Sequence, residues 1–451
     1  MLFIDNIIIF KKNSVGEFVM SLEIHMAKVG IGDCILVKMG EKSRKLNLLI
    51  DSGKNDDGYS ETIKYIRNKK EEIDYMVITH DDDDHIMGVF ENIVNGSKSK
   101  DNTIYSLLYD KHIIVNYWEK GTETLFDYKK IAKIGEKLKG KNIDLTDIDY
   151  VVADPLIKID GEEKVGFSLI QLLWKCDDEG TLSTKVRKYT GFEEECQKNV
   201  FLEVESGWEH AEMIILSPTK KSLYNYIKFV WEKYKKDQDE TETTFSVKNE
   251  KDRKNTNEWD YSIQKLYDNP MLFKEDDSLA NNASISFLLC YNGTIGLFAG
   301  DSKPSDMINT VQRYLDRFYS GEKKMQLDFM KVPHHASSNN NPLEFIKKFP
   351  TSNYLISTKG HNGYKHPGKQ TLANIAKAHD EDGKAYIYCN YATWKNSNIR
   401  FRDKEINWNV ENDLCKIKKS DGKSIELSFC ELKKNRKVIL NSLNKEVFIS
   451  L

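Results

Sequence analysis

Short apolar runs bounded by glycine or polar residues recur along the chain and predict β-strands. Between residues 20 and 80 such runs cover 22–26, 34–38, 46–50 and 75–78. Just before the last of these, residues 60–70 place Ile63 and Ile66 on one face, as an amphipathic helix does. This stretch therefore predicts three strands, a helix and a fourth strand.

Further along, the same kind of pattern predicts strands at 112–116, 213–217, 285–289, 294–298 and 354–357, and a helix at 128–138. Beyond residue 390 apolar and polar residues again alternate, for example at 424–429. We expect residues 391–451 to form a small β-rich C-terminal extension, which serves either as an interaction surface or as a structural cap.

The strand predicted at 75–78 leads through Thr79 into a dense polar turn, His80-Asp81-Asp82-Asp83-Asp84-His85. Carboxylates packed this closely repel one another and are costly to desolvate, so the turn either lies in water or binds a cation. Histidines at both ends of the run favour the cation. His80 and Asp82 alternate along one side, whereas Asp84 and His85 are adjacent and can face a second position, which favours two metal ions.

This turn resembles the first motif of the metallo-β-lactamase superfamily, H-x-H-x-D-H, with Asp82 at the place of the second histidine. The variant H-x-D-x-D-H is similar to that of the hydrolase domain of ComEC-type competence proteins, which act in DNA uptake. Two further signatures of that domain resemble V-G-I-G-D at 29–33 and L-I-D-S-G at 49–53. We expect Asp33 and Asp51 to support metal ligands rather than to bind metal themselves.

The resemblance implies the other half of the site. The G-D pair at 300–301 looks like the motif whose aspartate bridges two metals, which implies that role for Asp301. The stretch K-V-P-H-H-A-S at 331–337 is similar to K-V-P-H-H-G-S and implies His335 as a ligand, with His334 beside it or packed behind it. The metal ligands implied in this way are His80, Asp82, Asp84, His85, Asp301 and His335.

The stretch N-G-Y-K-H-P at 362–367 resembles the family's N-x-Y-x-H-P and implies that His366 stabilises or protonates a leaving oxygen. The expected catalytic residues are Asp84 and His366. Contacts to substrate are expected from His334, Ser337 and Asn362.

Many superfamily members carry a further metal-binding histidine where this chain has Asn281 and Asn282. This departure, with Asp82 in place of a histidine, makes the site richer in oxygen. Oxygen ligands shift the preference from zinc towards manganese. One or two divalent ions, manganese or zinc, are expected, and the number stays open.

Two segments depart from the family pattern and are expected to be insertions, at about 90–207 and 220–277. In the second, apolar residues recur at helical spacing from Leu223 to Tyr234, and a strongly charged stretch follows at 235–254. That helix either packs on the domain or holds a nucleic-acid strand by stacking and phosphate contacts. Residues 1–390 would then form the hydrolase domain, and the insertions or the extension could bind protein partners.

Composition excludes several classes of protein. The 451 residues include 67 basic and 70 acidic ones, so whole-chain charge does not argue for nucleic-acid binding. Seven cysteines without a C-x-x-C pair are typical of reduced intracellular thiols, which predicts a cytoplasmic protein. No apolar run approaches the roughly 18 to 20 residues that span a bilayer, so no membrane association is expected.

The resemblance implies an αββα sandwich of two mixed sheets with the metal site at one edge. The expected activity is hydrolysis of a phosphodiester, most directly by a nuclease acting on DNA or RNA, in a setting such as bacterial antiviral defence. One alternative is hydrolysis of a small ester, a lactone or a cyclic nucleotide, because the superfamily's site serves these as well. The other is a binding subunit without catalysis.

Overall fold

A computed structural model of the chain describes residues 21–41, 44–53, 56–80, 82–88, 112–116, 158–159, 162–163, 186–189, 199–203, 210–219, 221–223, 225–226, 229, 257–360, 366–381, 383–395, 408–409, 413–432, 438–441 and 447–449. The helix expected at 128–138 and the charged stretch at 235–254 lie outside these residues. Among the described helices, none combines the length and the apolar character needed to cross a membrane.

The first of two large sheets has the strand order β20-β19-β1-β2-β3-β4-β5-β8. Its strands are β1 (Ser21–Met26), β2 (Ile35–Glu41), β3 (Arg44–Ile50), β4 (Tyr75–Ile78), β5 (His112–Asn116), β8 (Val186–Tyr189), β19 (Val438–Asn441) and β20 (Val447–Ile449). Strands β1 to β3 are antiparallel, whereas β3, β4, β5 and β8 are parallel to one another. The strand expected at 112–116 is therefore present, as β5.

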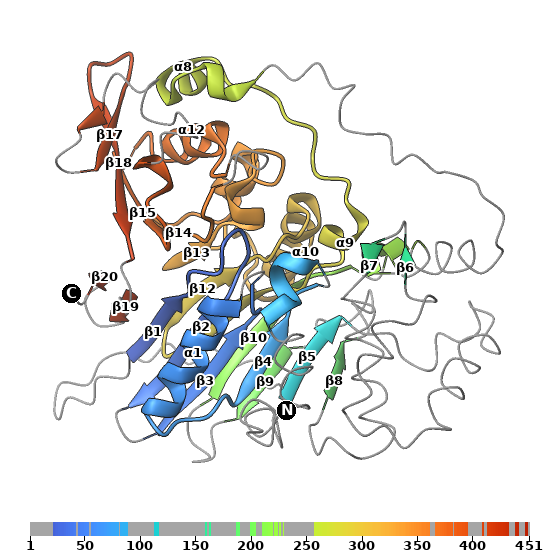
Figure 1. The fold of residues 1–451 in the computed structure, drawn as a ribbon. Helices are drawn as coiled ribbons and strands as arrows, with labels where there is room; N and C mark the ends of the chain where they lie inside the picture. The colour runs from blue at the N-terminus through green and yellow to red at the C-terminus, as the bar shows by residue number, and fades with distance from the viewer. Residues whose placement is uncertain are drawn as a thin grey trace, which may run out of the picture.

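Helix α1 (Asp56–Asn68) makes the crossover that lets β4 run parallel to β3. It buries Tyr59, Ile63 and Ile66, the last two being the residues whose spacing predicted a helix here. The helix lies on the first sheet (Figure 1), where the ring of Tyr65 contacts Lys38 of β2 at 5.1 Å.

The second sheet has the order β16-β17-β18-β15-β14-β13-β12-β11-β10-β9. Its strands are β9 (Asn199–Glu203), β10 (His210–Ser217), β11 (Ser286–Tyr291), β12 (Thr294–Phe298), β13 (Phe329–Lys331), β14 (Asn353–Ile356), β15 (Lys384–Cys389), β16 (Trp408–Asn409), β17 (Leu414–Lys418) and β18 (Ser424–Glu431). Strands β12, β13, β14, β15 and β18 are parallel. A separate pair, β6 (Lys158–Ile159) and β7 (Glu162–Glu163), is antiparallel.

The core has two layers, one on each face of the second sheet. Along β11, Phe287 and Leu289 pack with residues of the first sheet, whereas Leu288 packs with the helices on the other side. These helices are α8 (Ile263–Asp268), α10 (Pro304–Phe318), α11 (Leu343–Lys348) and α12 (Lys369–Ala378). Burial on both faces explains why Phe287, Leu288 and Leu289 are apolar at successive positions rather than at alternate ones. The layers therefore run helix, sheet, sheet, helix (Figure 1).

The strands beyond residue 390 continue the two large sheets. Strand β18 pairs with β15 and β17 in the second sheet, and β19 pairs with β1 in the first. Leu427 and Leu432 are buried with the two core layers. These strands thus extend both sheets, and β20 and β16 each form one edge of a sheet.

Candidate metal centre

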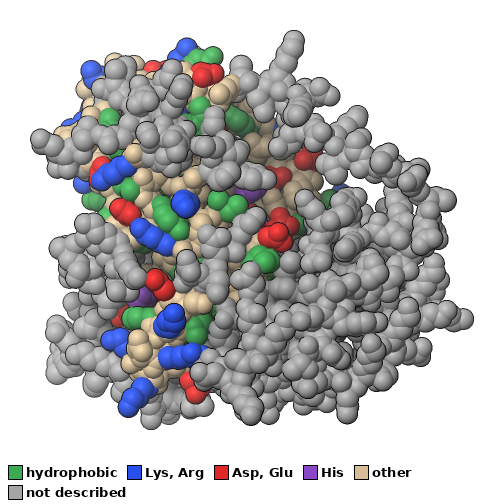
Figure 2. Space-filling view, viewed as in Figure 1, with side chains coloured by type: hydrophobic (Ala, Val, Ile, Leu, Met, Phe, Trp, Pro, Cys, Tyr) green, Lys and Arg blue, Asp and Glu red, His purple; other side chains and the backbone are tan. Residues whose placement is uncertain are grey.

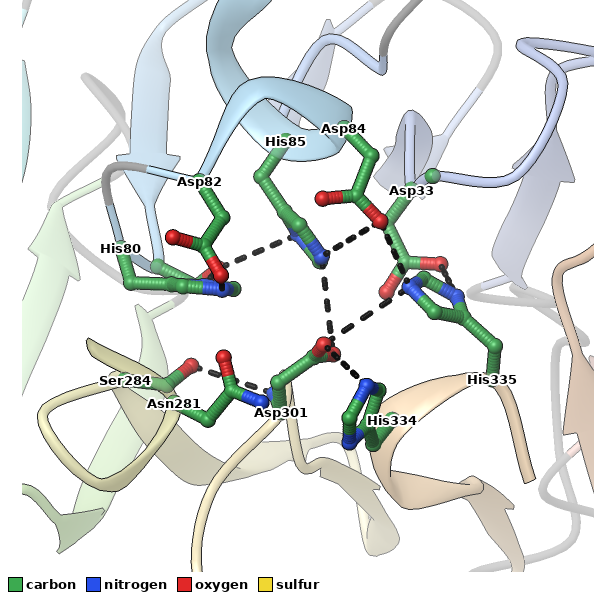
Figure 3. Close-up of polar contacts among 12 residues, drawn as sticks. Asp33, His80, Asp82, Asp84, His85, Asn281, Ser284, Asp301, His334 and His335 are labelled. Atoms are coloured by element: carbon green, nitrogen blue, oxygen red, sulfur yellow. Dashed lines mark hydrogen bonds and ion pairs between the residues drawn. The ribbon is translucent and has the colours of Figure 1, made fainter. Parts of the chain in front are cut away.

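The polar site lies where parallel strands of both sheets end. His80 and the acidic turn follow β4, Asp301 follows β12, and His334 and His335 follow β13. Carboxyl ends of parallel strands share one edge of a sheet, and the packing of two sheets brings their edges together. The six residues implied as metal ligands come together around this edge. Figure 3 shows Asp82 next to His80, and Oδ2 of Asp82 lies 3.7 Å from Nε2 of His80.

Local hydrogen bonds fix the turn that carries the first ligands. Residues 83–88 are helical, and the N–H of His85 donates to the carbonyl of Asp82 at 2.9 Å. The N–H of Ser52 donates to the carbonyl of His85 at 2.7 Å, so the L-I-D-S-G segment holds the start of this helix. The two segments predicted from separate motifs therefore form one unit.

The second half of the site turns sharply after β13. His334, His335 and Ala336 have φ of 46°, 52° and 67°, which is the left-handed region. Glycine adopts this region freely, and the family's motif has glycine where this chain has Ala336. The turn sets the two histidine rings at 74° to each other, with centroids 5.9 Å apart.

Each imidazole of the site uses Nδ1 for a protein contact and directs Nε2 to the centre. Nδ1 of His85 lies 2.8 Å from Oδ2 of Asp51, and Nδ1 of His335 lies 2.8 Å from the carbonyl of Ser357. Nδ1 of His80 lies 3.0 Å from Oγ1 of Thr79, which itself donates to Asp51. A proton on Nδ1 leaves the lone pair of Nε2 available to a metal.

The inward atoms converge on Asp301 (Figure 3). Its Oδ1 lies 3.5 Å from Nε2 of His85, and its Oδ2 lies 3.5 Å from Nε2 of His334 and 3.7 Å from Nε2 of His335. Nε2 of His335 also lies 3.4 Å from Oδ2 of Asp84. The carboxylate of Asp301 thus lies among the inward nitrogens of His85, His334 and His335.

Ligand atoms fall into groups of metal-binding size. One group is His80, His85 and Asp301, and another is Asp84, His85 and His335, with all donor atoms of a group within 4.8 Å of one another. A third, Asp33, Asp51 and His85, uses the outer side of His85.

The donor atoms themselves fit a bound cation. The Nε2 atoms of His80, His85 and His335 and Oδ1 of Asp301 are buried and have no hydrogen-bond partner within the described part of the chain. Buried polar atoms are nearly always paired, because an unpaired one loses its hydration without compensation. Divalent ions bound at the two groups would together satisfy all four atoms.

Electrostatics shows how strongly the site is negative. Burial opposes protonation of His335, but Asp301 and Asp33 outweigh burial and raise its pKa to about 10. Burial likewise opposes protonation of His85, yet Asp301, Asp84 and Asp51 raise the pKa of that ring well above its usual value. The carboxylates are stabilised by nearby positive charge. Protons on the histidines supply that charge without metal, and a metal ion would supply it when bound.

His366 behaves differently although its ring lies beside the site, 5.7 Å from that of His334 and 6.4 Å from that of His335. Burial, and then the neighbouring His334 and His335, lower the pKa of His366 to about 3. Its imidazole is therefore neutral near pH 7. Ser337 is buried in the adjacent turn, where its carbonyl accepts from Asn341 at 2.7 Å, and Asn362 lies outside the described residues.

Two supporting residues had no sequence signal. Oδ2 of Asp276 lies 3.1 Å from Nδ1 of His334, and Oδ1 of Asn340 lies 2.9 Å from the same atom. Asp276 is at the end of the segment expected to be an insertion, so only its contact reveals its place. Lys331, by contrast, belongs to a motif, and its buried ammonium donates to Asp33, whose other oxygen lies 3.5 Å from Nδ1 of His335.

Comparison with known proteins agrees with the first half of the site. Residues 27–91 match the family model of the metallo-beta-lactamase superfamily. The matched segment runs from the end of β1 through α1 and β4 to the acidic turn, and the superfamily consists mostly of metal-dependent hydrolases. A search of curated proteins finds no match to this chain.

Proposed function

We propose that this chain is a metal-dependent phosphodiester hydrolase, and specifically a nuclease acting on DNA or RNA. The observation that carries the proposal is the set of buried, unpaired donor atoms: Nε2 of His80, His85 and His335, and Oδ1 of Asp301. The superfamily match of residues 27–91 supports hydrolysis as the class of reaction. The choice of a phosphodiester rests on the similarity of H-x-D-x-D-H to competence-type hydrolase domains.

Divalent ions, when bound at such a site, supply Lewis-acid activation of water and neutralise charge that develops on phosphate. The residues that would hold them are His80, Asp82 and Asp301 on one side and Asp84, His85 and His335 on the other. Asp301 groups with His80 on the first side, and its Oδ2 lies 3.7 Å from Nε2 of His335 on the second, so it would serve both sides. Asp51 and Ser357 keep the lone pairs of two imidazoles aimed inward.

His334 is the proposed substrate contact. Asp276 holds its Nδ1 at 3.1 Å, and 23% of its side chain is exposed, whereas that of His335 is 3% exposed. Burial opposes its protonation, but Asp301 and Asp276 raise the pKa of His334 above the usual value. A partly exposed ring with a raised pKa, next to the metal positions, suits a phosphate oxygen.

His366 contributes in this proposal as a neutral ring. With a pKa lowered to about 3, it would orient a leaving oxygen by one hydrogen bond rather than deliver a proton to it. Neither His366 nor His334 distinguishes a polynucleotide from a smaller ester. On the face seen in Figure 2, the Lys and Arg side chains of the described residues are interspersed with acidic and apolar ones, so the described charge on this face does not favour one substrate.

The test is cleavage of end-labelled single-stranded and double-stranded DNA and RNA by the full chain with added Mn²⁺, Mg²⁺ or Zn²⁺. Asp84→Ala removes a ligand, and Asp83→Ala is the matched control because Asp83 is exposed on the same helical turn. We expect cleavage by wild type and by Asp83→Ala, and a loss of about 100-fold or more in Asp84→Ala. A cyclic nucleotide, an aryl ester and a lactone are tested in parallel. Equal rates for wild type and Asp84→Ala on every polynucleotide would refute the nuclease proposal.

A further inference from the structure

Asn281 ends the short helix α9 (Leu279–Asn282) and lies next to the metal centre, where it forms no part of the ligand set described so far. We infer that its side-chain amide oxygen is a ligand of the ion held by His80, Asp82 and Asp301. This inference rests on the proposed function and specifies one of its two metal positions. It replaces the expectation that asparagine here leaves that position one ligand short.

The first step is the orientation of the amide. Nδ2 of Asn281 donates to Oδ2 of Asp276 at 2.8 Å. Oδ1 of the same carboxylate accepts from the N–H of Ser278 at 3.0 Å, so Asp276 acts as an acceptor towards both groups. The nitrogen of Asn281 must therefore face Asp276, and its oxygen must face the other way.

The second step is where that oxygen points. Asn281 is 6% exposed, and its Oδ1 is buried without a hydrogen-bond partner among the described residues. In Figure 3 this oxygen is directed at the space beneath His80 and Asp82, to the side of Asp301. Nε2 of His80 and Oδ1 of Asp301 are likewise buried without a hydrogen-bond partner among the described residues.

The third step is how firmly the segment is held there. The N–H of Ile285 donates to the carbonyl of Thr79 at 2.9 Å, directly before His80. The hydroxyl of Ser284 accepts from the N–H of Asp301 at 3.2 Å, and the carbonyl of Ser284 accepts from Ser302 at 2.9 Å. Since both His80 and Asp301 are tied to the segment that carries Asn281, the amide oxygen has a set position relative to these two ligands.

The ligand set that results is one imidazole, two carboxylates and one neutral amide oxygen. Such an oxygen-rich set suits a hard cation such as Mn²⁺. The other position, with Asp84, His85 and His335, has two imidazoles and suits Zn²⁺ at least as well. Oδ2 of Asp276 contacts both Asn281 and His334, so one carboxylate oxygen positions the proposed metal ligand and the proposed substrate contact.

The experiment measures binding of Mn²⁺ alone to the metal-free full chain by equilibrium dialysis, with the electron paramagnetic resonance of free Mn²⁺ as readout. Variants are Asn281→Ala and Asn281→Ser, the second retaining a hydroxyl that can donate to Asp276. The matched control is Asn353→Ala, because Asn353 lies at the start of β14, the opposite end of that strand from the site, and its amide donates to the carbonyl of Asp328. Thermal unfolding without metal shows which variants are folded.

We expect two Mn²⁺ per chain in wild type and in Asn353→Ala. In each folded Asn281 variant one of the two should bind more weakly by at least the roughly 10- to 100-fold typical of losing a group that only orients a ligand. Asp276→Asn, which can still accept from Asn281, should lose less.

Two unchanged Mn²⁺ sites in the Asn281 variants would overturn the inference and leave the proposed function standing. The same holds if wild type binds a single Mn²⁺ that the variants retain, or if Asp276→Asn reproduces the entire loss, since Asn281 would then act through Asp276. If wild type binds neither Mn²⁺ nor, in a parallel dialysis, Mg²⁺ or Zn²⁺, the proposed function fails together with the inference.

Discussion

Oδ2 of Asp51 lies 2.8 Å from Nδ1 of His85, although the two residues are 34 positions apart, and both side chains are buried. The same oxygen accepts from the hydroxyl of Thr79 at 2.7 Å, and Oδ1 accepts from the N–H of Thr79 at 2.8 Å. One carboxylate at the end of β3 thus sets both the ring of His85 and the backbone that leads to His80. It lies behind the metal positions and acts on them through the imidazole.

Asp51→Asn should weaken metal binding by roughly 10- to 100-fold, because an amide at this place no longer holds the proton on Nδ1 of His85 as strongly. Calorimetric titration of the metal-free chain with Zn²⁺ measures the change. Asp316→Asn, an exposed change on α10, serves as control and should bind as wild type does. An unchanged affinity in Asp51→Asn would show that the hydrogen bond does not tune the ligand.

Gly32→Ala should damage the site through the backbone. A Cβ at Gly32 would lie 1.5 Å from the carbonyl oxygen of Asp84, so the acidic turn must move. We expect a lower free energy of unfolding, by about 1–3 kcal/mol or more, together with weaker metal binding. Gly293→Ala is the control, since nothing lies within 4 Å of its added Cβ. Its expected cost in free energy of unfolding is only the roughly 1–2 kcal/mol of placing alanine in the left-handed region. Denaturant unfolding and Zn²⁺ titration of both variants decide; equal metal affinity in the two would contradict the expectation.

Lys331→Met tests the buried ion pair behind His335. Lys331 and Asp33 are 1% and 2% exposed, and removing the ammonium leaves a buried carboxylate unpaired, which typically costs about 3–5 kcal/mol. Lys416→Met breaks a partly exposed pair with Glu426 and should cost no more than about 1 kcal/mol. Chemical denaturation without metal compares the two. A loss in Lys331→Met as small as that in Lys416→Met would mean that Asp33 finds another partner.

Metal binding should release protons at pH 7. The pKa of His335 is raised to about 10 and that of His85 is raised well above its usual value, so without metal both rings carry a proton at neutral pH. Burial opposes ionisation of Asp84 and Asp301, but the surrounding histidines outweigh burial and lower both pKa values, so these carboxylates stay ionised and release no proton. Affinity for Zn²⁺ should therefore rise from pH 6 to pH 8. Calorimetry in buffers of different ionisation enthalpy counts the protons, and a count of zero at pH 7 would contradict the assigned charge states.

Residue patterns were sufficient for the strands that build the site. The apolar runs at 46–50 and 75–78 are β3 and β4, and the run at 294–298 is β12. Local spacing and side-chain type are properties of a short segment, so they can be recognised without knowing what packs against it. The imidazoles and carboxylates after these strands were recognisable for the same reason.

The place of the C-terminal strands was a different matter. Their alternation identified strands such as β18, but not the partner of each strand. Hydrogen bonding to β15 and β1, which lie far away along the chain, joins them to the two sheets. Pairing over such separations depends on which edges are still open after the rest of the sandwich has formed.

From its covalent order alone, this chain specifies the ligand types and their positions at strand ends, because both follow from neighbouring residues. Folding in space adds the direction of each donor atom: Nε2 of His335 faces inward because Ser357 takes Nδ1, and Asn281 turns its oxygen inward because Asp276 takes its nitrogen. Lys331 meets Asp33 across 298 positions of sequence. Such contacts arise only when two sheets pack face to face, since no local pattern records which distant side chain will fill the space behind a ligand.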